Sequence, residues 1–383
     1  MMKKIILSIA AAVAFTAAGA QTVKVYKNGQ VTAEVADADS VVFSETKGGP
    51  VDQTKLCKTF AERVVEPTYR DMIAGNTSLL NTIKKFVANP TQDNMDDCAD
   101  AWLNARAPWE RSEAYLFGPV EDFNVDPNID SWPLEVGSIT QIMQQANWSA
   151  LEGDDESSQE IKGYHTLEYL IFSDGEARDI ATDKDYKANP TNWGIYMQKV
   201  AEMLVNETQT LYNKWFVTGD EQYGGLFKTY FCGDTYQNPL GEMIEGCSGI
   251  AEEVGNSKIG GPYEQAATDP EGAVYQVESW YSWHSRDDYM NNIRGIRFTY
   301  IGERSNNYND YAANSLRALV LEKKGAEYDK KVTDAIDAAI GAINNIPQPF
   351  RNHIRCTEVS NAMQKCADLK ETLDDMQADL GLN

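Results

Sequence analysis

From residue 52 onward, apolar side chains recur at intervals of three and four residues, as they do along one face of a helix. Leu56, Phe60 and Val64 open the pattern, and Pro67 is expected to kink the first helix. Thr91 is placed to cap the next helix, which we expect Pro108 to interrupt. Further helices are expected through residues 139–143, from 157 to 172, and over 193–216, 241–254, 309–323, 326–345 and 357–380. The pattern predicts an all-α fold of packed bundles.

The first fifty residues follow a different pattern. Apolar and polar residues alternate over 22–27 and 31–35 around an Asn28-Gly29 turn signal, and 40–44 forms a third short run. Residues 47–50 are expected to be a linker, 120–137 a loop and 260–262 a turn. The Gly- and Asn-Pro-containing stretch 218–239 marks the expected break between two halves. We therefore expect four parts, namely 1–20, a small β segment with its linker over 21–49, and helical bundles over 50–220 and 221–383.

The N-terminus has the composition of a cleavable secretory leader. Lys3 and Lys4 precede an apolar run from Ile5 to Phe15, and Ala18-Gly19-Ala20 resembles a cleavage site. No cysteine lies near that site, so no lipid attachment is expected, and no later stretch is apolar enough to cross a membrane. The small β segment that follows is similar to one found after the leader in many exported Bacteroidetes proteins. We expect a protein that is periplasmic, or secreted to the cell surface, and not an integral membrane protein.

The chain is strongly acidic, with a formal net charge of −24. Loss of the leader and its two lysines leaves −26, a balance that argues against nucleic acid as a partner and favours cations. Six cysteines in an exported chain permit disulfides, with fifteen possible connectivities. The short separations of Cys232 from Cys247 and of Cys356 from Cys366 make these pairs attractive. No CxxC pair is present, so a thiolate zinc site is not expected.

Within the helix expected over 157–172, His165 is followed three residues later by Glu168. Residues three apart lie on one face of a helix, and the apolar neighbours Ile161, Tyr164 and Ile171 indicate that this face is buried. A buried acid requires a partner. The pair is therefore either a nested hydrogen bond between imidazole and carboxylate, or half of a metal site.

A second pair of acids, Glu110 and Glu113, also has the i, i+3 spacing. If their helix packs against the one that carries His165, three carboxylates and one imidazole converge. Such a set suits iron, manganese or zinc. The alternative is that Arg106 and Glu110, four residues apart, form an ordinary surface ion pair. Trp109, next to these acids, is the tryptophan most expected to shape a pocket.

These motifs resemble the imelysin-like family, and the resemblance covers residues 52–383. The family's Gly-x-His-x-x-Glu motif is matched by Gly163, His165 and Glu168. Its other patterns are matched in order by Arg106, Trp109, Glu110, Glu113 and Phe117-Gly118-Pro119, by Glu278, Ser279, Ser282, Asp287, Asn292, Ile293 and Gly295, and by Pro347, Pro349 and Phe350.

The resemblance implies two pseudo-symmetric helical bundles with a site between them. It also implies an exported, metal-binding component of bacterial iron uptake, with an inner- or outer-membrane uptake component as a possible partner. His165, Glu168 and Glu113 are the expected metal ligands, and iron is the expected metal, with zinc as the alternative. Arg106, Trp109, Glu110, Ser282 and Asp287 are expected to line the site. For Ser282 and Asp287, helix capping or plain exposure is the alternative.

Two other functions compete with metal binding without turnover. The family name refers to an imelysin-type metallopeptidase, but no His-Glu-x-x-His pair of ligands and no Gly-x-Ser-x-Gly elbow occurs here. A peptidase would need His165 and Glu168 to supply ligand and base together. A module that binds haem or another surface ligand through His165 is the third possibility, which the acidic neighbours disfavour.

Overall fold

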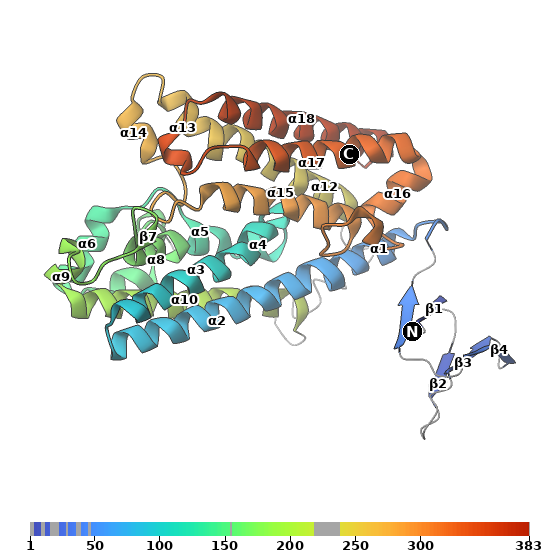
Figure 1. Cartoon of the computed structure of the whole chain (residues 1–383), viewed down its shortest axis with the longest axis horizontal. Coiled ribbons are helices and arrows are strands. Elements are labelled where there is room, and N and C mark those ends of the chain that lie inside the picture. The colour runs from blue at the N-terminus through green and yellow to red at the C-terminus, as the bar shows by residue number, and fades with distance from the viewer. Residues whose placement is uncertain are drawn as a thin grey trace.

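The computed structural model describes residues 47–153, 155–217 and 238–382 in full, together with the backbones of five short strands between residues 4 and 44. These strands form two small sheets beside the helical body (Figure 1). β1 (Lys4–Ser8) pairs in parallel with β5 (Ser40–Ser44), and β3 (Val23–Lys27) lies antiparallel between β2 (Ala12–Phe15) and β4 (Gln30–Val35). β3, β4 and β5 occur where strands were predicted, and the predicted turn between β3 and β4 lies outside the described residues. The leader and its cleavage stay a prediction.

Three long helices, α2, α3 and α10, form the frame of the first bundle, in which α2 packs against both α3 and α10 (Figure 1). Shorter elements complete the bundle over one end of this frame. The bounds are α1 Gln53–Phe60, the π-helical η1 Ala61–Val65, α2 Glu66–Ala88, α3 Gln92–Ser112, the 3-10 turn η2 Glu113–Tyr115, α4 Pro119–Asp122, α5 Val125–Asp130, α6 Val136–Gln145, η3 Trp148–Glu152, α7 Glu156–Gln159, α8 Gly163–Ile171, β6 Phe172–Ser173, β7 Glu176–Ala177, α9 Lys184–Ala188 and α10 Pro190–Phe216.

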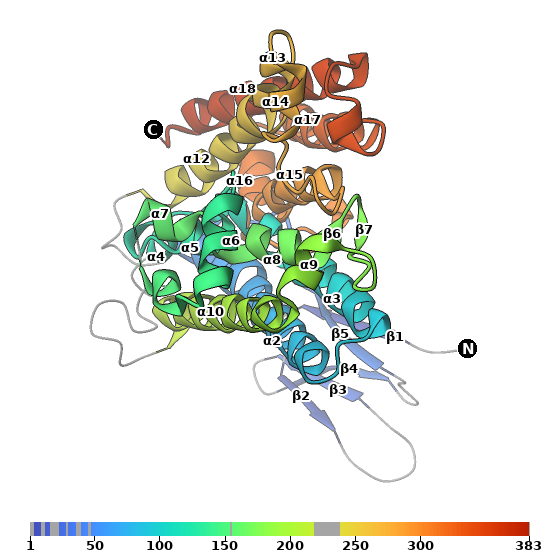
Figure 2. The same ribbon diagram turned by 90° about the vertical axis from the view of Figure 1, so that its left-hand side faces the viewer.

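The second bundle stacks on the first, with α15 next to α3 and with α12, α17 and α18 beyond it (Figure 2). The bounds are α12 Pro239–Glu252, the π-helical η4 Glu253–Ile259, α13 Gly260–Gln265, α14 Pro270–Val274, α15 Ser285–Ile301, η5 Tyr308–Asp310, α16 Leu316–Lys323, α17 Ala326–Asn344, η6 Phe350–Asn352 and α18 Thr357–Leu380. In the part of the chain that the structure describes, no helix combines the length and the apolar character needed to span a bilayer.

The predicted all-α fold is confirmed, and the two bundles begin alike. In each, an α-helix runs directly into a π-helical segment and then into a further α-helix, as α1–η1–α2 and as α12–η4–α13. The boundary predicted near residue 220 falls in 218–237, outside the described residues, and stays a prediction.

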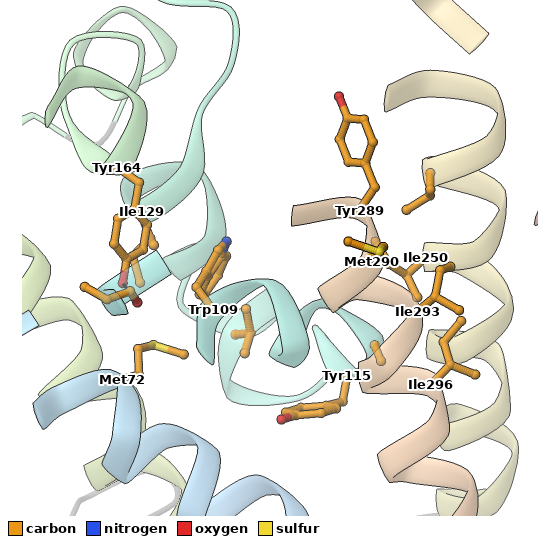
Figure 3. Packing of buried hydrophobic residues seen from close by; sticks show 14 of the residues in the cluster. Met72, Trp109, Tyr115, Ile129, Tyr164, Ile250, Tyr289, Met290, Ile293 and Ile296 are labelled. Atoms are coloured by element: carbon orange, nitrogen blue, oxygen red, sulfur yellow. Dashed lines mark hydrogen bonds between the residues drawn. The ribbon is translucent and has the colours of Figure 1, made fainter. Parts of the chain in front are cut away.

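A continuous hydrophobic core joins the bundles (Figure 3). Trp109 and Tyr115, at the end of α3 and in η2, lie between Tyr164 of the first bundle and Ile293 of α15 (Figure 3). Gly295 permits this close approach, because a Cβ there would lie 2.3 Å from the Arg111 carbonyl oxygen. The end of α3 is thereby held against the second bundle, which fixes the distance between the acids of α3 and the residues of α15.

Pro108 does not interrupt α3, contrary to the sequence-based expectation. The helix continues to Ser112 because it is anchored on both sides of the proline. Trp102 Nε1 donates to the Tyr164 carbonyl at 2.9 Å, and Trp109 Nε1 donates to Asp130 Oδ2 at 2.6 Å. Tertiary contacts thus outweigh the helix-breaking tendency of proline.

Two segments expected to be loop or turn are helical. Residues 120–137 contain the end of α4, all of α5 and the start of α6, and Pro127 is tolerated because it lies in the first turn of α5. Residues 260–262 open α13, where Pro262 is again in the first turn. Conversely, the helix expected from residue 309 begins only at Leu316, where the Ser315 side chain caps it.

The five cysteines in the described residues are free thiols, so Cys356 and Cys366, whose short separation makes a disulfide attractive, do not form one. Cys247 is likewise unpaired, and Cys232 lies outside the described residues. Cys57, Cys98, Cys247 and Cys366 are buried apolar side chains, and burial raises the pKa of each thiol to about 12. They serve as core packing and are not reactive nucleophiles.

Candidate metal centre

Gly163 begins the helix that carries the central histidine. α7 ends at Gln159 and α8 begins at Gly163, whose φ is +86°, so the single helix expected over 157–172 is divided. A Cβ at Gly163 would lie 2.4 Å from the Ile129 carbonyl oxygen. Glycine therefore lets α5 approach the start of α8 closely, and this approach brings Asp130 next to His165.

His165 is fully buried and both of its ring nitrogens have carboxylate neighbours. Nδ1 lies 3.0 Å from Glu168 Oε2, on the same face of α8. Nε2 lies 3.2 Å from Asp130 Oδ1 and 3.3 Å from Glu278 Oε1. Glu168 thus orients the ring so that Nε2 points at one acid from each bundle.

Glu168 also connects the two bundles. Its Oε1 accepts two hydrogen bonds from Ser282, one from the backbone N–H and one from Oγ, each at 2.8 Å. The Ser282 segment is a tight turn before α15 in which Ser279 and Trp283 have positive φ values of 53° and 61°. With these bonds at Oε1 and the contact of Oε2 with His165, Glu168 joins the two bundles and orients the histidine, and one lone pair of Oε2 remains.

Arg106 and Glu110 are not a surface pair, because both side chains are fully buried. Arg106 Nη2 lies 2.6 Å from Glu110 Oε1 and donates to Glu278 Oε1 at 2.7 Å, while Nη1 donates to Asp130. Its Nε lies 3.5 Å from Asp288 Oδ2. One guanidinium therefore contacts four carboxylates, two from each bundle.

Glu113 lies at the outer side of the same cluster. Asn292 Nδ2 donates to Glu110 Oε2 at 2.7 Å and to Glu113 Oε2 at 2.8 Å, which brings the two acids of the i, i+3 pair together. Lys258, from the π-helical segment η4, places its Nζ 3.1 Å from Glu113 Oε2 and 2.9 Å from Glu278 Oε2. The ammonium bridges the outer and inner acids.

Two tryptophans border the cluster. Trp109 is buried and donates to Asp130, so it orients an acid and does not line an open pocket. The ring of Trp132 lies over His165, with 4.8 Å between the ring centroids. Trp132 is half-buried and forms the outer cover of the histidine.

Of the predicted residues, only Asp287 lies away from the cluster. It is half-exposed, and its nearest charged partner is His284, 3.9 Å away. The next residue, Asp288, is the buried one, and its Oδ2 accepts from Ser279 Oγ at 2.6 Å. Asp288 Oδ1 has no hydrogen-bond partner among the described residues. A helix turns by about 100° per residue, so an error of one position reverses burial.

Sequence analysis also missed Asp130, Lys258 and Trp132, and it quoted Glu278 only as part of a pattern. Asp130 and Trp132 fall in the segment interpreted as a loop, and Lys258 in a segment beyond the expected helix end. No local pattern could show that Lys258 faces the acids.

The cluster carries more negative than positive groups. Six buried carboxylates, namely Glu110, Glu113, Asp130, Glu168, Glu278 and Asp288, surround the permanent cations Arg106 and Lys258. Burial raises the pKa values of Glu110 and Glu113 well above the usual range, in spite of Arg106 and Lys258 respectively. Without a further cation, burial therefore favours the neutral, protonated form of these two acids.

The inner acids behave in the opposite way. Burial acts to raise the pKa of Glu278, but Lys258 and His165 outweigh it and hold the value at about 2. Burial likewise opposes the ionisation of Asp130, yet Arg106 and His165 keep its pKa well below the usual range. For His165, burial and Arg106 act to lower the pKa, but Asp130 and Glu168 raise it well above the ordinary value. These shifts favour the protonated form of His165 and the ionised forms of Asp130 and Glu278.

This arrangement can hold a metal ion in two overlapping positions. One set consists of Asp130, His165 and Glu278 and the other of Glu110, Glu113 and Asp130, and the potential ligand atoms of each set lie within 4.8 Å of one another. Carboxylate oxygens with a single imidazole nitrogen suit iron, manganese or zinc. A carboxylate beside the second ring nitrogen is typical of metal-bound histidine, and Glu168 provides one at Nδ1 of His165. The donor set therefore fits a transition metal.

Comparison with known proteins agrees with this fold. Residues 65–376 match the family described as Imelysin. The chain is 26% identical over 324 residues to iron-regulated protein A of Synechococcus elongatus, across 82% of this chain and 83% of the relative. A crystal structure described as an iron-regulated protein A precursor from Parabacteroides distasonis is 34% identical, with a TM-score of 0.79 over 88% of this chain and 97% of that one. An imelysin-like protein from Psychrobacter arcticum, 14% identical, shares the fold over 88% of this chain and 99% of its own, with a TM-score of 0.64.

Proposed function

This chain belongs to the imelysin family, and we propose that it is an exported protein of iron uptake that binds a transition-metal ion at His165 without turning over a substrate. The observation that carries the proposal is the fully buried imidazole whose Nε2 faces Asp130 and Glu278 while Glu168 fixes Nδ1. The names of two relatives refer to regulation by iron, which supports iron as the cargo, with zinc as the alternative.

The roles of the residues follow from these contacts. His165, Asp130 and Glu278 are the inner ligands, and Glu113 and Glu110 offer a second, oxygen-only position that shares Asp130. Glu168 and Ser282 orient the histidine, and Arg106 and Trp109 orient Asp130. A metal ion would replace the protons on the outer acids and on His165 as the counter-charge of the cluster.

The geometry favours binding over the other two functions. A metallopeptidase needs a carboxylate placed to accept a proton from water, and Glu168 is fully buried and already makes three polar contacts, with Ser282 and His165. An axial haem ligand needs an open face beside the imidazole, and the His165 ring is fully buried. Delivery of the ion to an uptake component of the inner or outer membrane, from the periplasm or the cell surface, completes the proposed role.

Metal titration of the mature protein tests this proposal. After chelator treatment, Fe(II) and Zn(II) are titrated while tryptophan fluorescence is followed, since Trp109 and Trp132 adjoin the site. We expect Asp130→Asn and His165→Ala each to weaken binding at least 100-fold, because each removes a ligand. His353→Ala, outside the cluster, is the matched control. Equal affinity in all four proteins would refute the site. Cleavage of an unfolded polypeptide by the loaded protein, abolished in Glu168→Gln, would establish the peptidase instead.

A further inference from the structure

An acidic pocket opens on the surface beside the outer end of the cluster. Its volume is about 280 Å³, and it lies between the segment that follows α3 and helix α12. Four carboxylates line it, together with small and apolar residues: Glu113, Glu121, Glu242, Glu253, Leu116, Phe117, Gly246, Gly249 and Ile250. Burial, with Glu245 and Glu121 nearby, raises the pKa of Glu242 above its usual value, as expected where like charges crowd together.

The pocket reaches the metal centre through one residue. Glu113 lines the pocket and is also a member of the carboxylate set with Glu110 and Asp130. From Glu113, the Lys258 ammonium leads to Glu278, and Glu278 Oε1 lies 3.3 Å from His165 Nε2. An unbroken series of charged groups therefore connects the surface to the histidine.

We propose that this pocket is the route by which the metal ion reaches His165, and that the Lys258 ammonium is the internal cation that the ion displaces on its way. The inference rests on the proposed function and adds the path to it. A cavity that reaches a ligand residue is the structural basis. The attraction comes from three carboxylates at its mouth, the exposed Glu121 and Glu253 and the half-buried Glu242.

The other faces of His165 are less suited to a hydrated cation. Arg106 closes one with a positive charge, its Nη2 lying 3.2 Å from His165 Nε2. The apolar ring of Trp132 covers another. A cation that crossed either face would lose hydration without gaining oxygen ligands, which is costly. The pocket offers carboxylate oxygens at its mouth and again at its inner end.

A larger apolar side chain in the pocket wall tests whether the ion passes through the pocket, without changing any charge. A Cβ at Gly249 would meet no atom within 4 Å, so Gly249→Leu places a side chain in open space in the pocket wall. Leucine also favours the helix. The substitution leaves the metal-free and the Zn(II)-bound sites unchanged and affects only the path between them. We therefore expect the association and dissociation rates of Zn(II) to fall together, about tenfold, with Kd within twofold of wild type. Gly341→Leu, in α17 with equally free space, is the matched control. Unchanged rates in Gly249→Leu would refute the route.

Neutralising the three acids at the mouth of the pocket tests whether they attract the metal ion. We expect Glu121→Gln/Glu242→Gln/Glu253→Gln to slow Zn(II) association about tenfold at low salt, and the difference to shrink at high salt. The control carries three substitutions at exposed acids outside the pocket, Glu264→Gln/Glu271→Gln/Glu371→Gln, which change the net charge equally. Equal slowing in both triple variants would show a general charge effect and refute a local route.

If wild type binds Zn(II) through His165 but neither pocket variant alters the rates, the proposed function stands and this inference fails.

Discussion

At the scale of single residues, the cluster uses each charged group in a distinct way. Glu168 contacts Ser282 and His165 through its two oxygens and so orients the imidazole. Arg106 contacts four acids, and Lys258 bridges two acids that a metal would bind. Removal of one partner of a buried ion pair typically lowers the free energy of unfolding by about 3–5 kcal/mol. The same lysine competes with any incoming cation for Glu113 and Glu278. Lys258 should therefore stabilise the metal-free protein and weaken metal binding.

We expect Lys258→Met to show both effects. The free energy of unfolding of the stripped protein should fall by about 2–4 kcal/mol, less than a full unpaired charge would cost, because the freed acids can take up protons. Zn(II) affinity should rise about tenfold or more. Urea unfolding with and without Zn(II) measures both, and Lys330→Met, an exposed lysine in α17, is the control. Lower Zn(II) affinity in Lys258→Met would contradict the role of an internal competitor.

At the scale of elements, local patterns predicted the helices whose faces are amphipathic along their whole length. The period of apolar residues placed α10 and α18 to within a few residues. It failed where long-range contacts decide the structure. Pro108 remains within α3 because Trp102 and Trp109 anchor both sides of it, and α5 forms in a segment of loop-like composition because it packs against α8. Asp130 was missed for that reason, whereas His165 was found from its spacing to Glu168.

The break between α7 and α8 gives the second prediction. Gly163 has φ +86° and leaves no room for a Cβ, which would lie 2.4 Å from the Ile129 carbonyl oxygen. Gly163→Ala should cost about 1–3 kcal/mol from backbone strain alone, and more from the clash. Because α5 must move, Asp130 should shift from His165 and Zn(II) affinity should fall. Gly341→Ala, in the open face of α17, should instead stabilise by about 0.5–1 kcal/mol. Thermal unfolding and Zn(II) titration compare the two variants, and wild-type behaviour of Gly163→Ala would contradict this account.

At the scale of the whole molecule, the candidate metal centre lies where two bundles meet and each bundle supplies part of it. α3, α5 and α8 bring Arg106, Asp130 and His165, while η4 and the turn before α15 bring Lys258 and Glu278. Ion binding therefore affects the contact between the halves as well as a local site. In the metal-free protein, bound protons and the cations Arg106 and Lys258 compensate the excess negative charge of the cluster. Stability and metal binding should therefore both depend on pH.

The direction of that dependence follows from the shifted pKa values. Glu110, Glu113 and His165 have pKa values raised above their unfolded ones, so the folded state binds more protons and stability falls as pH rises above about 4.5 for the acids and about 6.5 for the histidine. Glu278, with a pKa of about 2, stabilises above its unfolded pKa of 4.5, and this contribution is lost as pH falls from about 4.5 towards 2. For these groups, the metal-free protein should be most stable near pH 4.5, and its stability should fall as pH rises above that value, more steeply once His165 also contributes above about 6.5.

A bound metal should oppose the loss of stability at higher pH, because its positive charge replaces the protons that Glu110, Glu113 and His165 lose. We expect Zn(II) affinity to rise from pH 5.5 to 7.5, and the Zn(II)-induced gain in the free energy of unfolding to rise with it. Urea unfolding at a series of pH values, with and without Zn(II), measures both. Repulsion among surface acids also grows with pH, but 0.5 M salt screens it and leaves the buried groups largely unaffected. A metal-free stability that stays flat between pH 6 and 8.5 in high salt would show that the buried acids and His165 do not hold these protons.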